Sequence, residues 1–408
     1  MMRVDIPLPR MRQDLDIQVV PIDDEPSVLL TDPWSEESMP WVMSEIAFAV
    51  LQMLDGKRTL RQVQASLRRF TGGLSMPMEQ LQQLVIQFQS LVLLEDETYR
   101  LERLPVREAY LNATSRPPAH AGISYPEEAD ALDVYLSDVL ALASPNVGLT
   151  RNGSSIRAVV APHLDLRVEE EAYATTYQAI RGMEPDRIIL LGTGHEITDG
   201  LFSLTHKDYT TPLGAMPCDR EAVEALRDAG GDLCTAHDLA HRGEHALEFQ
   251  VPFLQKVLAR PDVPIVPILC GSFYSDLQEV KRASEVSGVP KFLDALRDLI
   301  TDNTLVVAGV DFSHIGRKFG HDEPASAMID TVREHDETLL EALCAHDAPG
   351  FWGEVQRTDN SYYVCGFSSL SVMMEVLPSC KGEVLRHDFW DEQETESAVS
   401  FASVLLRG

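Results

Sequence analysis

Short apolar runs that end abruptly in turn-forming residues dominate the pattern of the second half of the chain. Three of them, 156–161, 187–191 and 304–310, consist largely of aliphatic, mostly β-branched residues. Such runs are typical of buried strands in a parallel sheet. Segments with helical periodicity lie between them and other strand-like runs. The pattern predicts an α/β domain with a mixed sheet and flanking helices.

The predicted elements of this domain follow one another from residue 127 onward. Helices are expected over 127–142, 169–182, 219–229, about 244–260, 289–301, 325–345 and 367–377. Strands are expected over 156–161, 187–191, 201–206, 265–270, 304–310, 383–389 and 398–406. No internal repeat or low-complexity segment interrupts this order.

The first hundred residues follow another pattern. Two extended segments, 17–21 and 27–31, flank an acidic turn and predict a hairpin. Three helices follow: one over 44–54 capped by Ser44, one with an apolar face, and one that opens at residue 75 or 76. The apolar face of the second helix is expected to contain Leu60, Val63, Leu67 and Phe70. A short segment over 98–101 completes a small winged-helix domain as its wing.

The length of the chain agrees with two domains. A chain of 408 residues exceeds one ordinary domain, so we predict a winged-helix domain over 1–103, a proline-containing linker over 104–124 and the α/β domain over 125–408. The formal net charge is −30, which disfavours nucleic-acid binding through a broad surface. Six scattered cysteines, no signal-peptide pattern and no long apolar run predict a reduced, cytoplasmic protein without a membrane partner.

Histidines follow the three apolar runs within a few residues. His163 follows the first run, His195 the second, and Asp311 and His314 the third. Since open α/β sheets bind ligands at the carboxyl ends of their strands, these side chains predict a shared site. A single histidine at a strand end is more often structural, whereas three at equivalent positions favour a site. Asp311 and His314 are candidates for a base and its orienting partner, or for a simple ion pair.

Another group of histidines, His237, His241 and His245, is spaced four residues apart and offers a weaker metal-site candidate. Gly243 and the polar run around it indicate a loop, and HRGEH does not match the HExxH zinc pattern. Glu244 and His245, which open a helix, are better candidates for groups that orient a metal ligand or transfer a proton. The remaining histidines at 206, 321, 335, 346 and 387 are expected on the surface.

The amino-terminal pattern resembles a known family of peptide-binding domains. The segment SEIAFAVLQMLDGKRTLRQV is similar to the helix, turn and next helix of the PqqD-like family, and the resemblance covers roughly Asp14–Glu102. It implies that the amino-terminal domain accepts a peptide. The alternative is a structural appendage.

The α/β domain carries the motifs of a second family. From about His120 to Gly408 the chain resembles the Memo family, whose bacterial member is AmmeMemoRadiSam system protein B, through the motifs APHLD, ILLGTGHE, TPLG, GEHALEFQVPFLQ, VDFSHIG and CG. The resemblance implies the fold of class III extradiol dioxygenases. It also implies metal ligation by His163, His195 and Cys365, with Asp311, His314, Glu244 and His245 beside the metal as catalytic candidates. Implied partners are a radical S-adenosylmethionine enzyme and an AMMECR1-like protein.

The implied ligand set favours particular metals. Two imidazoles and a thiolate suit iron(II) or copper, with zinc as the less favoured choice, and three protein ligands leave coordination positions open. We therefore expect redox chemistry, linked to oxygen. The alternatives are zinc-type hydrolysis with Asp311 or His314 as base, and a non-catalytic scaffold that binds metal or peptide. Without the family resemblance, Cys365 would be interpreted as an inert buried cysteine. The chain departs from the family pattern in APHLD and in Glu196, where a second histidine is common.

Overall fold

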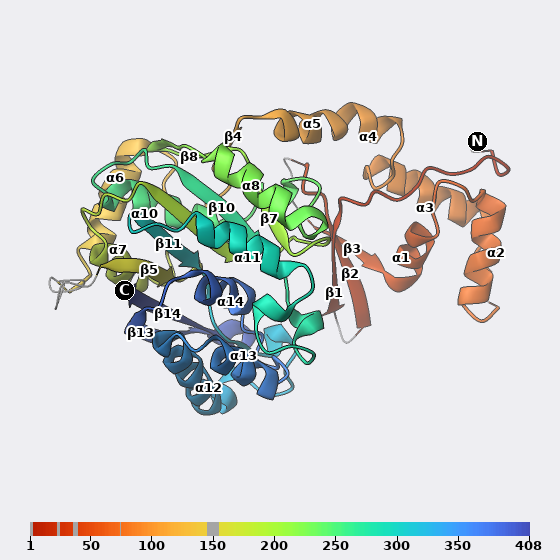
Figure 1. Ribbon diagram of the computed structural model, residues 1–408. Helices are drawn as coiled ribbons and strands as arrows, with labels where there is room; N and C mark the ends of the chain where they lie inside the picture. Colours follow the sequence, from red (N-terminus) through yellow and green to blue (C-terminus); the bar gives the residue numbers. More distant parts are fainter. Residues whose placement is uncertain (1–2, 23–24, 36–39, 74, 145–154) are drawn as a thin grey trace. The chain divides into compact units, whose positions relative to one another are not determined.

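The computed structural model describes residues 3–22, 25–35, 40–73, 75–144 and 155–408 (Figure 1). The chain divides into two compact units, Met1–Asn112 and Ala113–Gly408. Among the described helices, none combines the length and the apolar character that a membrane crossing requires. Each unit has its own core, so the two are described in turn.

The smaller unit combines a three-stranded antiparallel sheet with five helices in its described residues. The strands pair in the order β1-β2-β3, so the predicted hairpin over 17–31 is present and a third strand, missed from the sequence, extends it. The tip of the hairpin at 23–24 lies outside the described residues. The elements are β1 (Asp16–Ile22), β2 (Glu25–Thr31), β3 (Trp41–Ser44), α1 (Glu45–Gln52), α2 (Leu60–Phe70), α3 (Met78–Ser90), α4 (Glu97–Glu102) and α5 (Leu104–Asn112).

Helix-capping residues explain where the helices of this unit begin. The Ser44 side chain accepts a hydrogen bond from the Ala47 amide at the start of α1, as the sequence predicts. Thr59 and Gln62 form a reciprocal capping box at the start of α2. Three of the four predicted apolar positions of α2 are buried, but Phe70 is 64% exposed because it ends the helix beyond the core.

Two predictions for the end of this unit are wrong. Residues 98–101 form no wing, because the Asp96 side chain accepts hydrogen bonds from the Thr98 and Tyr99 amides and starts α4 there. The predicted linker contains α5, because a proline in the first turn of a helix, here Pro105, interrupts no helical hydrogen bond. Farther along, residues 115–116 form strand β4 of the larger unit.

The larger unit is built on a mixed sheet, as predicted, and this sheet has eight strands in the described residues. Its strand order is β12-β14-β5-β11-β6-β10-β7, and β13 pairs with β14. Strands β5, β11, β6 and β10 are parallel, whereas β14 and β7 run antiparallel to their neighbours. The strands are β5 (Ile156–Ala161), β6 (Arg187–Thr193), β7 (Phe202–Leu204), β10 (Ile265–Cys270), β11 (Thr304–Gly309), β12 (His314–Gly316), β13 (Lys381–Glu392) and β14 (Ser397–Arg407). A small separate sheet contains β4 (Ser115–Arg116), β8 (Asp208–Thr211) and β9 (Gly214–Met216).

Helices cover both faces of the large sheet (Figure 1). Alternate residues of β5 serve the two cores: Val160 packs with the layer of α8, α11 and α14, and Val159 packs with the layer of α6, α7 and α10. Burial on both faces explains the uninterrupted apolar runs of the central strands. The helices are α6 (Ala129–Leu140), α7 (Glu170–Ala179), α8 (Arg220–Gly230), α9 (His245–Glu248), α10 (Gln250–Val257), α11 (Val289–Asp298), α12 (Ala325–Ala345), α13 (Ala348–Arg357) and α14 (Phe367–Val376).

A tight contact fixes the distance between β11 and the segment formed by α9 and α10. A Cβ atom at Gly309 would clash with the Ala246 carbonyl oxygen and approach Nε2 of Gln250 to 2.6 Å. We therefore expect Gly309→Ala to lower the free energy of unfolding by about 1–3 kcal/mol. Gly353→Ala in α13 is the control, because a Cβ there meets nothing within 4 Å and should raise the stability by about 0.5–1 kcal/mol. Urea unfolding of the full chain, with the transitions fitted separately, measures the stability of both variants. Equal changes in the free energy of unfolding for Gly309→Ala and Gly353→Ala would contradict the close approach at Gly309.

Candidate metal centre

The order of the central strands brings three chemistry-bearing loops to one edge of the sheet. Strand β11 lies between β5 and β6, and all three are parallel. His163, His195 and Asp311 each lie two residues beyond the last residue of one of these strands. Parallel strands end at the same edge of a sheet, so the three side chains become neighbours although they are far apart in sequence.

His163, His195 and Cys365 come together at this edge. The Sγ atom of Cys365 lies 3.3 Å from Nε2 of His163 and 3.4 Å from Nε2 of His195. The candidate ligand atoms of the three side chains all lie within 4.8 Å of one another. One sulfur and two imidazole nitrogens are therefore close enough to bind a single metal ion.

Hydrogen bonds on the other ring nitrogen orient both imidazoles. Nδ1 of His163 lies 3.0 Å from the Gly309 carbonyl oxygen, and Nδ1 of His195 lies 3.0 Å from Oε1 of Glu244. Both oxygens are acceptors, so each Nδ1 carries a proton. Nε2 is then the atom that is free to bind a metal, as is usual when a second group fixes the tautomer of a ligating histidine.

Cys365 is held by its backbone and by the glycine that follows it. The Cys365 amide donates to the Phe312 carbonyl oxygen at 2.9 Å, and the Gly366 amide donates to the Asp311 carbonyl oxygen at 2.8 Å. A Cβ at Gly366 would lie 2.9 Å from that same carbonyl oxygen and from Cβ of Val310. The glycine of the CG pair is therefore required for the close approach of this loop to residues 310 and 311.

Electrostatics favour the thiolate form of Cys365. Burial alone raises its pKa, but the two imidazoles beside the sulfur hold the pKa well below its usual value. Burial lowers the pKa of His163, but Asp311 and Cys365 outweigh it and raise the pKa to about 9. In the same way Cys365 and Glu244 raise the pKa of His195 to about 11. The cluster thus favours a deprotonated sulfur, which is the form of cysteine that binds a metal ion.

Two buried carboxylates support the histidines. Oδ1 of Asp311 accepts the His163 amide at 2.9 Å, and burial raises the pKa of Asp311. Glu244 accepts the amides of His195 and Ala246, each at 3.0 Å. Although burial raises the pKa of Glu244, its contact with His195 outweighs this and keeps the pKa far below the usual range. Glu244 is therefore an anion that orients His195.

The four residues predicted to act beside the metal are not all equally close to the three candidate ligands. The His245 ring stacks on His195 with 5.0 Å between centroids, and its Nδ1 lies 3.2 Å from Oε1 of Glu244. Burial lowers the pKa of His245 to about 3, so its ring is neutral. His314 instead places Nδ1 3.1 Å from the Phe312 carbonyl oxygen and packs against Phe319. Within the described residues, two groups of side chains could share a metal ion: His163 with His195 and Cys365, and His195 with Glu244 and His245. His314 belongs to neither group.

Sequence reasoning missed two residues near the centre, because both lie in the segment read as a linker. His120 packs edge-on against His245, and its Nε2–H donates to the Gly243 carbonyl oxygen, 2.9 Å away. Arg116 is fully buried and ion-pairs with Glu248. No local sequence pattern identifies Arg116 as a buried arginine. His120 could have been found, because it lies at the start of the segment that resembles the Memo family.

The histidine stripe at 237, 241 and 245 is not a metal site. Both ring nitrogens of His241 are occupied, Nδ1 by the Tyr209 hydroxyl at 2.8 Å and Nε2 by the Ser203 carbonyl oxygen at 3.0 Å. His237 is exposed in a bend. The expectation of surface positions also fails for His335, which is 2% exposed and pairs with Glu354 because it lies on the inner face of α12.

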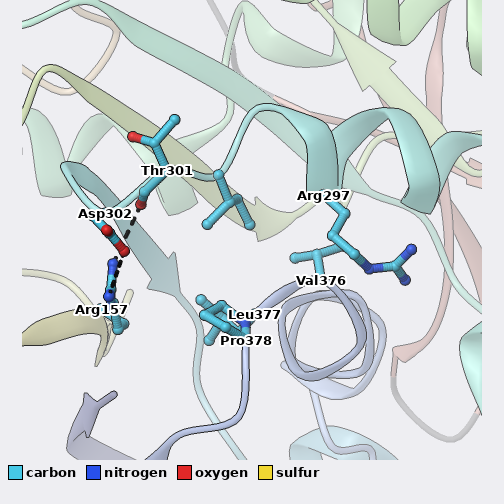
Figure 2. Close-up of a pocket in the computed structure, with 8 residues that line it drawn as sticks. Arg157, Arg297, Thr301, Asp302, Val376, Leu377 and Pro378 are labelled. Carbon is cyan, nitrogen blue, oxygen red and sulfur yellow. Dashed lines mark hydrogen bonds and ion pairs between the residues drawn. The ribbon is translucent and has the colours of Figure 1, made fainter.

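A pocket of about 420 Å³ lies elsewhere, at the amino-terminal ends of β5 and β11. Figure 2 shows Arg157 with Asp302 on one side of it and Leu377 with Pro378 below. Arg157 is the second residue of β5, whereas His163 follows the other end of that strand. The pocket therefore shares no lining residue with the candidate centre.

The shifted pKa of Cys365 can be tested in chelator-treated protein. Because its folded-state pKa is lowered, we expect iodoacetamide to label Cys365 at about pH 6, where a usual thiol with a pKa of about 8.5 reacts slowly. Burial raises the pKa of Cys218 and Cys270, so these should stay unlabelled. Peptide mass spectrometry identifies the site, and His195→Gln should shift labelling to higher pH. Labelling of Cys365 only above about pH 8 in the unmodified protein would contradict the geometry.

Comparisons with known proteins agree on one family. A family model described as Memo-like protein matches residues 116–405. A MEMO1 family protein of Aquifex aeolicus (strain VF5) is 30% identical and covers 90% of this chain and 93% of its own length. This share exceeds what Ala113–Gly408 alone supplies, so the match extends into the smaller unit.

Another relative and a solved structure also match parts of the chain. The MEMO1 family protein TK1477 of Thermococcus kodakarensis is 30% identical over 72% of this chain and 99% of its own length. The crystal structure of uncharacterized protein JW3007 from Escherichia coli K12 aligns over 62% of this chain and 99% of that chain at 15% identity, but its TM-score of 0.35 is too low to carry an argument. The family model and the two relatives are sufficient: the chain belongs to the Memo family.

Proposed function

We propose that the larger unit is a metal-dependent redox domain in which His163, His195 and Cys365 bind iron(II) or copper. The observation that supports this proposal most is the convergence of one sulfur and two Nε2 atoms within 4.8 Å of one another. This donor set fits iron(II), copper or zinc, and it does not fit magnesium or calcium, which prefer oxygen ligands. Bound iron or copper would supply electron exchange with dioxygen, which zinc does not offer.

The residues around the three ligands have distinct roles in this proposal. Glu244 orients His195 and stays ionised. His245 presents a neutral imidazole beside His195, and its side chain is one-third exposed. Its place beside His195 makes it the candidate to contact a substrate proton, although its lowered pKa makes it a weak base. Asp311 holds the His163 backbone at the buried side of the centre.

Hydrolysis is the second candidate, and the same neutral His245 favours it. An exposed, uncharged imidazole beside a metal can also accept a proton from water. The two candidates differ in metal and in the role of the sulfur. Oxygen activation benefits from the electron density that a thiolate donates, whereas hydrolysis needs only Lewis acidity.

Oxygen uptake separates the two candidates. We expect protein loaded anaerobically with iron or copper to consume oxygen in the presence of a reductant, and Cys365→Ser to lose this uptake at matched metal occupancy. The reason is that serine cannot replace the donation of electron density by the thiolate. Cys344→Ser is the matched control, because Cys344 lies at the end of α12 and should leave uptake unchanged. An oxygen electrode measures the rates.

Three results would contradict the redox function. Equal uptake by the unmodified protein and Cys365→Ser would remove the thiolate from the chemistry. Activity with zinc alone would favour hydrolysis. If the unmodified protein binds no metal but still binds its partners, the result would favour a scaffold.

We also propose that the protein works within an AmmeMemoRadiSam-type system, with a radical S-adenosylmethionine enzyme and an AMMECR1-like protein as partners. The motifs of the α/β unit support this assignment, and we propose for that unit the fold of class III extradiol dioxygenases. For the smaller unit we propose a PqqD-like domain that binds a peptide by adding it to β1. In the described residues β1 is paired on one side, with β2, which leaves an edge for an extra strand.

Peptide binding by the smaller unit can be tested by NMR on residues 1–112. Because this segment has its own core, we expect the fragment to fold alone. Titration with the two partner proteins should shift the backbone amides of β1 more than those of β3, which forms the other edge of the sheet. A folded fragment whose β1 amides do not respond to either partner would make the unit a structural appendage.

A further inference from the structure

The Thr193 side chain is placed to act on the sulfur of Cys365. Thr193 is the last residue of β6, two residues before His195. Its Oγ1 lies 3.0 Å from the Cys365 carbonyl oxygen and 3.4 Å from Cys365 Sγ. Among the described residues, the other side-chain atoms within hydrogen-bonding distance of this sulfur are the two histidine Nε2 atoms. Thr193 is therefore the one hydrogen-bonding neighbour of Sγ that is not itself a candidate ligand.

The direction of the hydrogen bond between Thr193 Oγ1 and Cys365 Sγ depends on which of the two atoms carries a proton. The hydroxyl donates to the Cys365 carbonyl oxygen at 3.0 Å, and a protonated Sγ would donate to Oγ1 at 3.4 Å. A metal-bound thiolate has no proton, so the 3.4 Å contact can then be made only with the threonine hydroxyl as donor. The same hydroxyl also lies within reach of the Cys365 carbonyl oxygen. A single proton shared between these two acceptors ties the backbone and the sulfur of Cys365 to the end of β6.

We propose that Thr193 is a positioning residue that donates a hydrogen bond to the metal-bound Cys365 thiolate and so sets how strongly this sulfur donates electrons to the metal. The inference rests on the proposed metal site and adds to it a residue that tunes the site. Hydrogen bonds to ligand sulfur withdraw electron density and shift the properties of the metal, as they do in iron–sulfur and blue-copper sites. Removal of the hydroxyl should therefore make the sulfur a stronger donor.

A purely structural role would give a different result. If Thr193 only joined β6 to the Cys365 loop through the carbonyl contact, its loss would lower stability or metal affinity and leave the electronic character of the sulfur unchanged. The energy of the sulfur-to-metal charge-transfer band reports this character directly. A stronger donor sulfur moves the band to lower energy.

The test uses cobalt(II) as a spectroscopic probe in the full-length protein. Thr193→Val keeps the shape of the side chain and removes the hydroxyl, whereas Thr193→Ser keeps the hydroxyl. We expect the charge-transfer band of Thr193→Val at lower energy than that of the unmodified protein, with Thr193→Ser unchanged. Cobalt affinity should fall in Thr193→Val by about 10–100-fold, the usual effect of losing a group that supports a metal ligand.

Two further variants make the result decisive. Thr338→Val, in α12, also removes a threonine hydroxyl that donates to a backbone carbonyl, and it should leave the band in place. Thr193→Ala removes the hydroxyl without adding a methyl group at its position, so it should reproduce the shift even if valine disturbs the fold. Bands of Thr193→Val and Thr193→Ala at the energy of Thr193→Ser would overturn the inference.

The outcomes also separate this inference from the proposed function. A cobalt-loaded unmodified protein without any thiolate charge-transfer band would refute the three-residue metal site itself. A band that is present in the unmodified protein and lost in Cys365→Ser, but unmoved by removal of the Thr193 hydroxyl, would refute only the role of Thr193.

Discussion

The candidate centre depends on the side-by-side order of β5, β11 and β6. This order makes the loops after the three strands neighbours, and each loop contributes a side chain to the same small volume. The loop after the central strand contributes Asp311, whose two neighbours are the histidine loops. It also provides the carbonyl oxygens at residues 311 and 312 that hold Cys365 and Gly366. One strand order therefore positions both histidines and the cysteine.

The support around the histidines is polar and buried, and it comes from distant parts of the chain. Glu244 starts α9 and orients His195, while Gly309 ends β11 and orients His163 through its carbonyl oxygen. Arg116 ion-pairs with Glu248 and binds the Glu244 carbonyl oxygen, which fixes the segment that carries Glu244. The buried charge of Arg116 is tolerated because it is paired with Glu248 and hydrogen-bonded to backbone carbonyl oxygens. The side chains of the centre are thus held before any metal binds.

Much of this arrangement could be predicted from the sequence, because it depends on local patterns. Strands buried on both faces give continuous apolar runs, and the runs 156–161 and 265–270 coincide with the observed strands β5 and β10. The helix over 325–345 also has its predicted bounds. The histidines at strand ends stood out because their positions relative to the strands are equivalent. Local capping likewise predicted the start of α1 at Ser44.

The rest could not be predicted because it depends on contacts between residues far apart in sequence. Nothing in the residues around Cys365 distinguishes it from an inert cysteine; its place is set by hydrogen bonds to the loop at 311–312, and only family resemblance suggested it. The strand order of the sheet and the role of Arg116 are equally non-local. At the end of the smaller unit, a side-chain cap by Asp96 outweighed the turn-like acidic run and produced a helix where a wing was expected.

X-ray absorption at the metal edge tests the central claim most directly. In protein loaded anaerobically with iron(II) or copper, the account predicts one sulfur ligand at about 2.3 Å and two imidazole nitrogens at about 2.0–2.1 Å from the metal, the bond lengths usual for such donors. A first coordination sphere that contains only nitrogen and oxygen, in a protein whose Cys365 is reduced, would contradict it.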